Sequence, residues 1–266
     1  MGKLVLGKLG ETRDVQPTPR HRLYVTAGLR SEDEVTLSAA QSHRLLHVLR
    51  AARGESVALF NGRDGEWRAE LAHANKRGAG LVVRDQLRPQ EAESDLWLLF
   101  APIKRGPLDL IAEKATELGV SALIPVWTQH ADVQRINADR LAAIAIEAAE
   151  QCRRLTVPAV GEPRSLDDAI AGWPTSRRLI ALDESGRGAP IAQALAAIGD
   201  GPAAILVGPE GGFAESELDA LRRLSFAVAV DLGPRILRAE TATIAALACY
   251  QALRCGEPAI CSIQSR

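Results

Sequence analysis

The sequence of 266 residues has few aromatic side chains and few cysteines, and it lacks any long apolar run. No stretch approaches the roughly 20 apolar residues that a membrane-spanning helix needs. Residues 1–20 are polar and lack the apolar segment of a secretory signal peptide. These absences predict a soluble, cytoplasmic protein with no membrane partner, whose cores are built from aliphatic side chains.

Patterns that bind metal ions are also missing. The cysteines show no Cys-x-x-Cys spacing, which would indicate a zinc or redox site: they are Cys152, Cys249, Cys255 and Cys261. His43 and His47 have the spacing of a metal-binding pair on a helix, but no third ligand is indicated. We therefore predict reduced thiols, a surface or packing role for the two histidines, and no metal.

The net charge of −1 conceals an asymmetry along the chain. Residues 1–90 contain 15 Lys and Arg against 10 Asp and Glu, whereas residues 91–266 contain 17 against 23. A basic small region joined to an acidic larger one favours a module that binds a polyanion beside a catalytic body. The excess of positive charge is modest, so by itself it only slightly favours nucleic acid.

The first ninety residues read as a short extension followed by a small β domain. Residues 1–20 show no consistent period and are interpreted as an extension. Ser38 is expected to cap a helix that runs to Arg50, and Asn61-Gly62 favours a hairpin. Short strands are expected at 22–25, 34–37, 56–60, 66–71 and 80–83. The pattern predicts a small β-barrel over residues 21–89.

A polar, proline-containing stretch, Leu87–Asp95, precedes an abrupt change of pattern and is the best domain boundary in the sequence. Strands and helices then alternate. Strands are expected at 96–101, 121–126, 157–160, 178–182, 203–207 and 226–230, and helices at 107–118, 138–153 and 240–254. This alternation predicts an α/β domain with a largely parallel sheet over residues 96–266.

Two late segments each combine a buried strand, a glycine-proline loop and a helix. The loop after the first strand reads LVGPEGGF (206–213), and the second reads LGPRILRAETA (232–242). Open α/β sheets bind ligands at the loops that follow strand ends, so the pair is expected to frame one pocket. The apolar Ile236 and Leu237 stand where a loop is usually polar, which favours a ligand-binding wall.

Common nucleotide-binding motifs do not match these loops. The first loop is not followed by the Lys-Ser/Thr pair of a P-loop, and neither it nor Gly186-Arg-Gly188 completes a dinucleotide fingerprint. Its glycines instead allow the backbone to approach a ligand closely. A tight turn with no ligand accounts equally well for the first loop taken alone.

The two loops in tandem resemble the signature of the RsmE family. These SPOUT-class methyltransferases modify N3 of a uridine in bacterial small-subunit (16S) ribosomal RNA. Further matching segments follow in the same order: RLYV (22–25), HVLR (47–50), EKATELGV (113–120) and EAAEQCRR (147–154). The resemblance extends from about His21 to the C-terminus.

The resemblance implies a PUA-like RNA-binding barrel, an α/β SPOUT domain with a deep trefoil knot, and a homodimer. The near-continuous apolar character of the last helix suits such an interface, although a helix buried within the domain would look the same. The implied cofactor is S-adenosylmethionine. By motif, its site comprises Leu182, Leu206, Val207, Gly208, Pro209, Gly211, Gly212, Leu232, Gly233, Ile236, Leu237 and Arg238.

Methyl transfer to N3 requires alignment of donor and acceptor and removal of the N3 proton. Candidate bases are Glu210 and Glu240, with Arg238 positioning the uracil. A helix N-terminus also favours an acidic residue, so a structural role for Glu240 stays open. The basic residues inside matched segments are the candidates for phosphate contacts: Arg22, Arg50, Lys104, Arg105, Arg153 and Arg154.

Two alternatives remain open at this stage. One is another SPOUT RNA methyltransferase, such as a ribose 2′-O enzyme, and the other is a ribosome-assembly RNA-binding protein without catalytic activity. The chain departs from the family pattern at Ala214, where Ser or Thr is usual. This alanine leaves Glu217 as the remaining half of a capping box.

Overall fold

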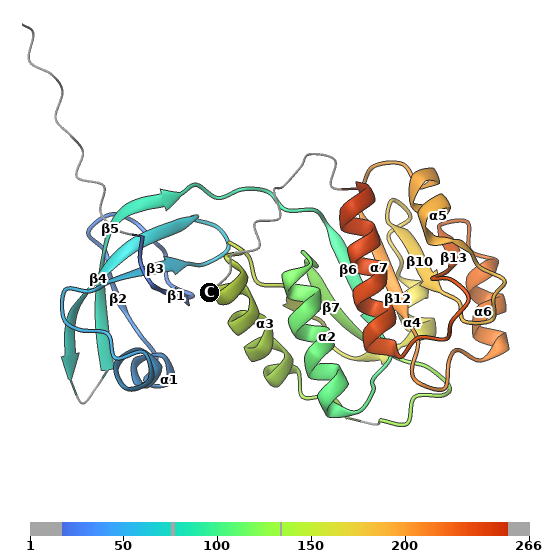
Figure 1. The fold of residues 1–266 in the computed structure, drawn as a ribbon, viewed down its shortest axis with the longest axis horizontal. Helices are drawn as coiled ribbons and strands as arrows, with labels where there is room; N and C mark the ends of the chain where they lie inside the picture. The colour runs from blue at the N-terminus through green and yellow to red at the C-terminus, as the bar shows by residue number, and fades with distance from the viewer. Residues whose placement is uncertain (1–17, 76–77, 134, 255–266) are drawn as a thin grey trace, which may run out of the picture.

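Residues 18–75, 78–133 and 135–254 are described by a computed structural model, in which two sheets carry separate cores (Figure 1). The first sheet has five strands in the order β1-β3-β4-β5-β2. Its strands are β1 (His21–Tyr24), β2 (Glu34–Thr36), β3 (Ser56–Phe60), β4 (Glu66–Asn75) and β5 (Gly78–Arg88). β1 pairs with β3 in parallel, and the other neighbours are antiparallel.

The helix of this domain begins where the sequence predicts. Ser38 accepts a hydrogen bond from the backbone of Gln41, and the Gln41 side chain accepts one from the backbone of Ser38. The helix is α1 (Ala39–His43), which widens into a π-helical turn, η1 (Arg44–Val48). The aliphatic faces of the strands and of the helix form one core around Leu23, Leu45 and Leu81.

The second sheet is parallel at every pairing among the described residues, as predicted. Its order is β11-β13-β10-β12-β6-β7-β8, with β9 also paired to β7. The strands are β6 (Leu96–Phe100), β7 (Ala122–Trp127), β8 (Ala159–Val160), β9 (Arg164–Ser165), β10 (Arg178–Leu182), β11 (Ala189–Pro190), β12 (Ala203–Val207) and β13 (Ala227–Asp231). The helices are α2 (Arg105–Glu117), α3 (Ala138–Cys152), α4 (Leu166–Ala171), α5 (Ile191–Ala197), α6 (Glu215–Arg222) and α7 (Ala239–Arg254).

Helices cover both faces of this sheet. Ile205 and Val207 of the central strand β12 pack into the core under α2, α3, α5 and α7, whereas Leu206 packs into the opposite core under α4 and α6. A strand that is buried on both faces reads as a continuous apolar run, which explains the sequence AAILV. Figure 1 shows α3, α2 and α7 side by side along one face, and α2 packs against both of the others.

The two domains meet where β1 packs against α3. Phe60 from the first domain and Ala149 and Leu155 from the second form a small shared core. Around it, the backbone N–H of Tyr24 donates to the Glu150 carboxylate at 2.9 Å. The interface is therefore partly apolar and partly built from polar groups that find partners across it.

Within the described ranges no helix is both long and apolar enough to cross a bilayer. The same ranges contain no cluster of three His, Cys, Asp or Glu side chains suited to a metal ion. Cys255, Cys261 and residues 1–17 lie outside these ranges.

Candidate functional site

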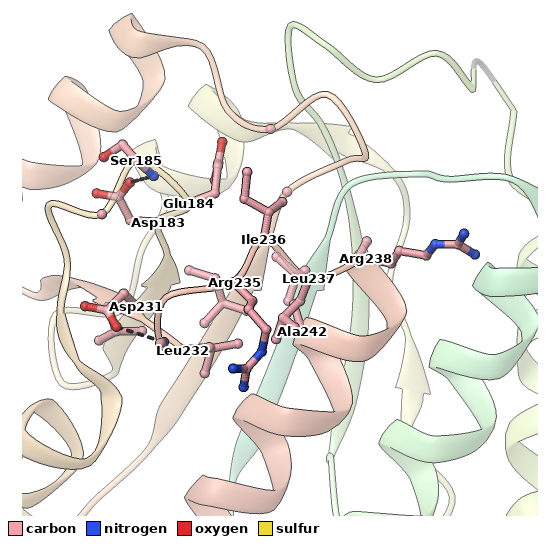
Figure 2. A pocket seen from close by; sticks show the side chains of 18 of the residues that line it. Asp183, Glu184, Ser185, Asp231, Leu232, Arg235, Ile236, Leu237, Arg238 and Ala242 are labelled. Carbon is pink, nitrogen blue, oxygen red and sulfur yellow. Dashed lines mark hydrogen bonds between the residues drawn. The ribbon is translucent and has the colours of Figure 1, made fainter.

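Three neighbouring strand ends come together at one edge of the large sheet. β10 lies between β12 and β13, and all three run parallel, so the segments that follow them emerge on the same side. These segments are 183–188, 208–214 and 232–238. They enclose a cavity of about 410 Å³ with the start of α7 (Figure 2). Its lining comprises Leu182, Asp183, Glu184, Ser185, Gly186, Val207, Gly208, Pro209, Glu210, Gly212, Val230, Asp231, Leu232, Gly233, Pro234, Arg235, Ile236, Leu237, Arg238, Ala239 and Ala242.

Much of this lining is apolar. The strand ends contribute Leu182, Val207 and Val230, which belong to the main core, so the floor of the cavity is continuous with it. Ile236 from the last segment is 87% exposed, which is unusual for a large aliphatic side chain. Exposed apolar surface beside a cavity is typical of a site that a flat, partly apolar ligand covers.

The glycines of the 208–214 segment lie in tight surroundings. A Cβ on Gly208 would lie 3.0 Å from the ring of Phe213, and Gly212 adopts a φ of +69°. A side chain at position 212 would also collide with the Glu184 carboxylate. The backbone conformation at Gly212 strains any residue with a side chain, whereas at Gly208 the Phe213 ring would have to shift.

Glu184 joins two of the three segments. Its Oε1 accepts a hydrogen bond from the backbone N–H of Phe213 at 3.0 Å. Just before it, the Asp183 side chain is completely buried and contacts Arg222 of α6 at 2.7 Å. Burial raises the pKa of the Asp183 carboxyl, but hydrogen bonds from Ser185 and Arg222 outweigh that effect and lower the pKa below its ordinary value. Asp183 is therefore a buried ion-pair partner that supports the wall of the cavity.

The third segment carries the exposed charges. The carboxylate of Asp231 accepts from the backbone N–H of Gly233 at 2.9 Å, which shapes the turn. The Arg238 carbonyl accepts from Ala242 at 2.8 Å, and α7 starts at the next residue. Figure 2 shows the Arg238 side chain extending away from the other labelled side chains of the lining. Arg235 and Arg238 are both exposed, and neither side chain has a hydrogen-bond partner within the described ranges.

Ten of the twelve positions predicted for a cofactor line this cavity: Leu182, Val207, Gly208, Pro209, Gly212, Leu232, Gly233, Ile236, Leu237 and Arg238. Leu206 does not, because side chains alternate along a strand and this one points into the core under α6. Gly211 is exposed outside the lining, where a Cβ would approach His130. At these two positions, contact with the cofactor stays a prediction.

The two predicted acid–base residues lie in different positions relative to the cavity. Glu210 is exposed on the cavity wall with Arg238, whereas Glu240 lies in the first turn of α7 and does not line the cavity. An acidic residue in that turn interacts favourably with the helix dipole. The structure thus favours the structural role for Glu240.

Two predicted phosphate contacts are instead engaged inside the protein. Arg22 contacts Glu66 and the carbonyls of Ala149 and Arg154, and its guanidinium lies 3.8 Å from the centre of the Phe60 ring. Arg154 is 9% exposed and donates to the carbonyls of Thr116 and Val120. The other four candidates are exposed: Arg50, Lys104, Arg105 and Arg153.

Sequence reasoning missed the wall that follows β10. Asp183, Glu184, Ser185 and Gly186 line the cavity, and so do Arg235 and Asp231. The strand 178–182 was predicted, but its position between the two loop-bearing strands was not. The order of the strands in the sheet would therefore have identified these residues, but no single motif encodes that order.

The remaining prediction in this region concerns Ala214. It precedes α6 and offers no side-chain cap, while Glu217 Oε2 accepts from its backbone N–H at 2.8 Å. Only half of a capping box is therefore formed, as predicted. The other oxygen of Glu217 accepts from the backbone of Gln129, which ties the loop after β7 to α6.

Comparisons with known proteins agree across both domains. A family model described as an RNA methyltransferase domain matches residues 90–251, and one described as an RNA methyltransferase PUA domain matches 37–83. Ribosomal RNA small subunit methyltransferase E of Rickettsia conorii is 32% identical over 86% of this chain and 93% of its own length. The protein of the same name from Synechocystis is 32% identical over 88% of this chain and 78% of its own length.

Solved structures give the same result. A ribosomal RNA small subunit methyltransferase E from Neisseria gonorrhoeae, bound to S-adenosyl methionine, is 30% identical with a TM-score of 0.79 and covers 88% of this chain and 97% of its own. A putative methyltransferase from Legionella pneumophila, also in complex with S-adenosylmethionine, is 28% identical with a TM-score of 0.76 and covers 87% and 96%.

Proposed function

The chain belongs to the RNA methyltransferase family, and we propose that it transfers a methyl group from S-adenosylmethionine to N3 of one uridine in small-subunit ribosomal RNA. It is an S-adenosylmethionine-dependent ribosomal RNA methyltransferase. The observation that carries the proposal is the cavity at the ends of β10, β12 and β13, which combines glycine-built loops with an apolar lining.

The residues present fit this cofactor. A cavity of about 410 Å³ lies within the range of small-molecule sites, roughly 300–1,000 Å³. The aliphatic side chains of Leu182, Leu232 and Leu237 offer an adenine ring apolar contact, and the glycine loop 208–212 presents backbone groups to its edge. A Cβ on Gly208 would press on the Phe213 ring and one on Gly212 on the Glu184 carboxylate, so glycine at both positions allows the present course of the loop.

When bound, S-adenosylmethionine supplies an electrophilic methyl group on its sulfonium. The chain must then hold the uracil in line with that methyl group and accept the N3 proton. Glu210 is the proposed acceptor, because it lies on the cavity wall and its exposed carboxylate is open to an incoming base. Arg235 and Arg238 are proposed to hold the nucleotide and to stabilise negative charge that develops on the uracil.

The finer features of the fold form part of the proposal. α6 and α7 cover opposite faces of the sheet, so the segment 232–238 crosses the sheet edge beside the other two loops. We propose that this crossing closes the trefoil knot. Residues 21–89 would act as the RNA-binding domain and residues 96–266 as the methyltransferase domain.

A homodimer is also proposed. Ile236 at the rim of the cavity and Leu253 on α7 are exposed aliphatic side chains, at 87% and 52%. Burial of such side chains by a second copy would be favourable by roughly 1.5–3 kcal/mol each. Sedimentation equilibrium should give twice the monomer mass.

Nucleoside analysis of ribosomal RNA tests the main proposal. Small-subunit RNA from a strain that lacks the gene should lose 3-methyluridine, and the purified protein with S-adenosylmethionine should restore it. Unchanged 3-methyluridine in the deletion strain would sink the N3 assignment, and loss of a 2′-O-methyl nucleoside instead would favour the ribose enzyme. Failure to bind S-adenosylmethionine in calorimetry would favour a non-catalytic RNA-binding protein.

A further inference from the structure

A buried ion pair joins the cavity wall to α6. Asp183 is the first residue after β10, and its side chain is fully buried. Its Oδ2 accepts from Arg222 Nη2 at 2.7 Å and its Oδ1 accepts from the backbone N–H of Ser185 at 2.9 Å. Arg222 stands in the last turn of α6 and does not line the cavity. It therefore reaches the wall only from behind.

The same guanidinium continues into a closed ring of contacts. Arg222 Nη1 lies 3.3 Å from Glu215 Oε1, and both Glu215 oxygens accept from Arg187 Nη2 at 2.5 and 2.6 Å. Arg187 Nε in turn lies 3.3 Å from Ser185 Oγ, and Arg222 Nη2 lies 3.2 Å from the same oxygen. The 183–188 segment is thus attached to α6 at Asp183, Ser185 and Arg187.

The 183–188 segment forms one wall of the cavity and also contacts the glycine loop that forms another. Asp183, Glu184, Ser185 and Gly186 all line the cavity. Glu184 accepts from the backbone N–H of Phe213, so the position of the segment also determines that of the glycine loop. A displacement of the segment would therefore change two of the three loops that surround the ligand.

We propose that Arg222 is a positioning residue for the cofactor site: it holds the 183–188 segment in the binding geometry through Asp183 and the Glu215–Arg187 pair. The role rests on the proposed function, because S-adenosylmethionine is the ligand whose affinity it controls. Removing the cation leaves the Asp183 carboxylate buried without its ion-pair partner. Movement of the segment outward toward water then becomes energetically favourable, because it hydrates the carboxylate. Ligand binding then becomes weaker, because part of the binding free energy is used to re-form the cavity.

Calorimetric titration with S-adenosylmethionine and S-adenosylhomocysteine measures this effect. In Arg222→Met, Kd for both should rise about tenfold, which corresponds to ~1.4 kcal/mol. Turnover at saturating cofactor should stay within about twofold, because Arg222 does not touch the reacting groups. Arg222→Lys keeps a cation opposite Asp183 and should recover most of the affinity. Arg223→Met, a change of the exposed residue that directly follows α6, should bind as the wild type does.

A purely structural role for Arg222 predicts a different pattern. A lower melting temperature with an unchanged Kd would overturn the proposal, and so would an equal loss of affinity in Arg223→Met. If Arg222→Met does not fold, Arg187→Met tests the outer part of the ring, since its side chain is 56% exposed. About a threefold rise in Kd is expected there, or ~0.6 kcal/mol, and no rise would overturn the proposal.

A double-mutant cycle checks the route of the effect. If Arg222 acts through Asp183, the variant with both Asp183→Asn and Arg222→Met should bind no more weakly than Arg222→Met alone. Multiplicative losses would show independent roles and overturn the inference. Absence of any binding by the wild-type protein would contradict the proposed function, whereas equal binding by wild type and Arg222→Met would contradict only this inference.

Discussion

The contact between the two domains and the cavity at the strand ends both concentrate charged side chains, but the charges are in opposite states. At the interdomain contact, the side chains of Arg22, Glu66 and Glu150 are between 5% and 10% exposed and paired. At the cavity, Glu210, Arg235 and Arg238 are exposed, and none has a side-chain hydrogen bond to the rest of the described structure. Paired buried charges hold a structure together, whereas exposed charges beside an apolar cavity are available to a ligand.

The largest expected effect comes from the interdomain contact. Arg22→Met leaves Glu66 buried with one remaining cation, Arg88, and removes the donors to the carbonyls of α3. Because Glu66 is buried and loses one of its two cations, and the carbonyls of α3 lose their donor, unfolding free energy should fall by up to about 3–5 kcal/mol. Urea titration measures this value. Arg84→Met, which breaks exposed ion pairs in the same domain, is the control and should leave stability nearly unchanged.

If the contrast between the regions is correct, Arg22→Met should keep its Kd for S-adenosylmethionine under conditions where it remains folded. A large loss of affinity without a loss of stability would show that Arg22 belongs to the functional site after all. The burial of Arg22 lowers its pKa, and Glu66 only partly opposes this. An interaction with RNA phosphate would require it to leave those partners.

The second predicted change lowers activity and leaves stability unchanged. Arg238→Ala should lower the rate of methyl transfer to ribosomal RNA by about 100-fold, or ~2.7 kcal/mol, and leave the melting temperature unchanged. The physical reason is that an exposed cation without an internal partner contributes little to folding but acts on the substrate. Single-turnover kinetics measures the rate, with Arg223→Met as the control. Near-wild-type transfer in Arg238→Ala would remove this residue from the site and leave Arg235.

A third change acts on the cavity walls. Gly212→Ala places a Cβ at a φ of +69° and against the Glu184 carboxylate. The backbone strain should cost ~1–2 kcal/mol of stability, and calorimetry should show weaker binding of S-adenosylmethionine because the loop 208–214 moves. Gly199→Ala is the matched control, since nothing lies within 4 Å of its Cβ position and its φ is ordinary. Equal effects at both glycines would contradict the assigned role of the loop.

These two regions also show how far the sequence could predict the structure. The longer strands and helices of the large domain follow from apolar periodicity, and the two glycine loops follow from their motifs. The two-residue strands β9 and β11 are too short to give such a pattern. The wall at Asp183–Gly186 does not, because its place depends on β10 lying between β12 and β13. The roles of Arg22 and Arg154 depend on partners more than 30 residues away in the chain, such as Ala149 for Arg22 and Thr116 for Arg154. A basic residue that binds RNA and one that joins two domains look the same in sequence.

The smallest effect is a pair of opposite pH dependences, one from each region. Burial raises the pKa of Glu150 above its ordinary value of 4.5, although Tyr24 and Arg44 partly oppose it. The folded state then binds more protons than the unfolded state above that value, so the contribution of Glu150 to stability is present at low pH and declines as the pH rises through the raised pKa. Asp183 is the reverse: its pKa is lowered from 3.8, so its contribution is present above 3.8 and is lost as the pH falls through the lowered pKa.

Urea titrations of the wild type, Glu150→Gln and Asp183→Asn at a series of pH values separate the two. The unfolding free energy of the wild type, relative to that of Glu150→Gln, should fall as the pH rises from 4.5, by at most ~1.4 kcal/mol per pH unit. The unfolding free energy of the wild type, relative to that of Asp183→Asn, should fall as the pH drops below 3.8. Slopes of the same sign would mean that Glu150 is stabilised as an anion by Arg44 and Arg22, and that the interdomain contact is held by charge more strongly than by burial.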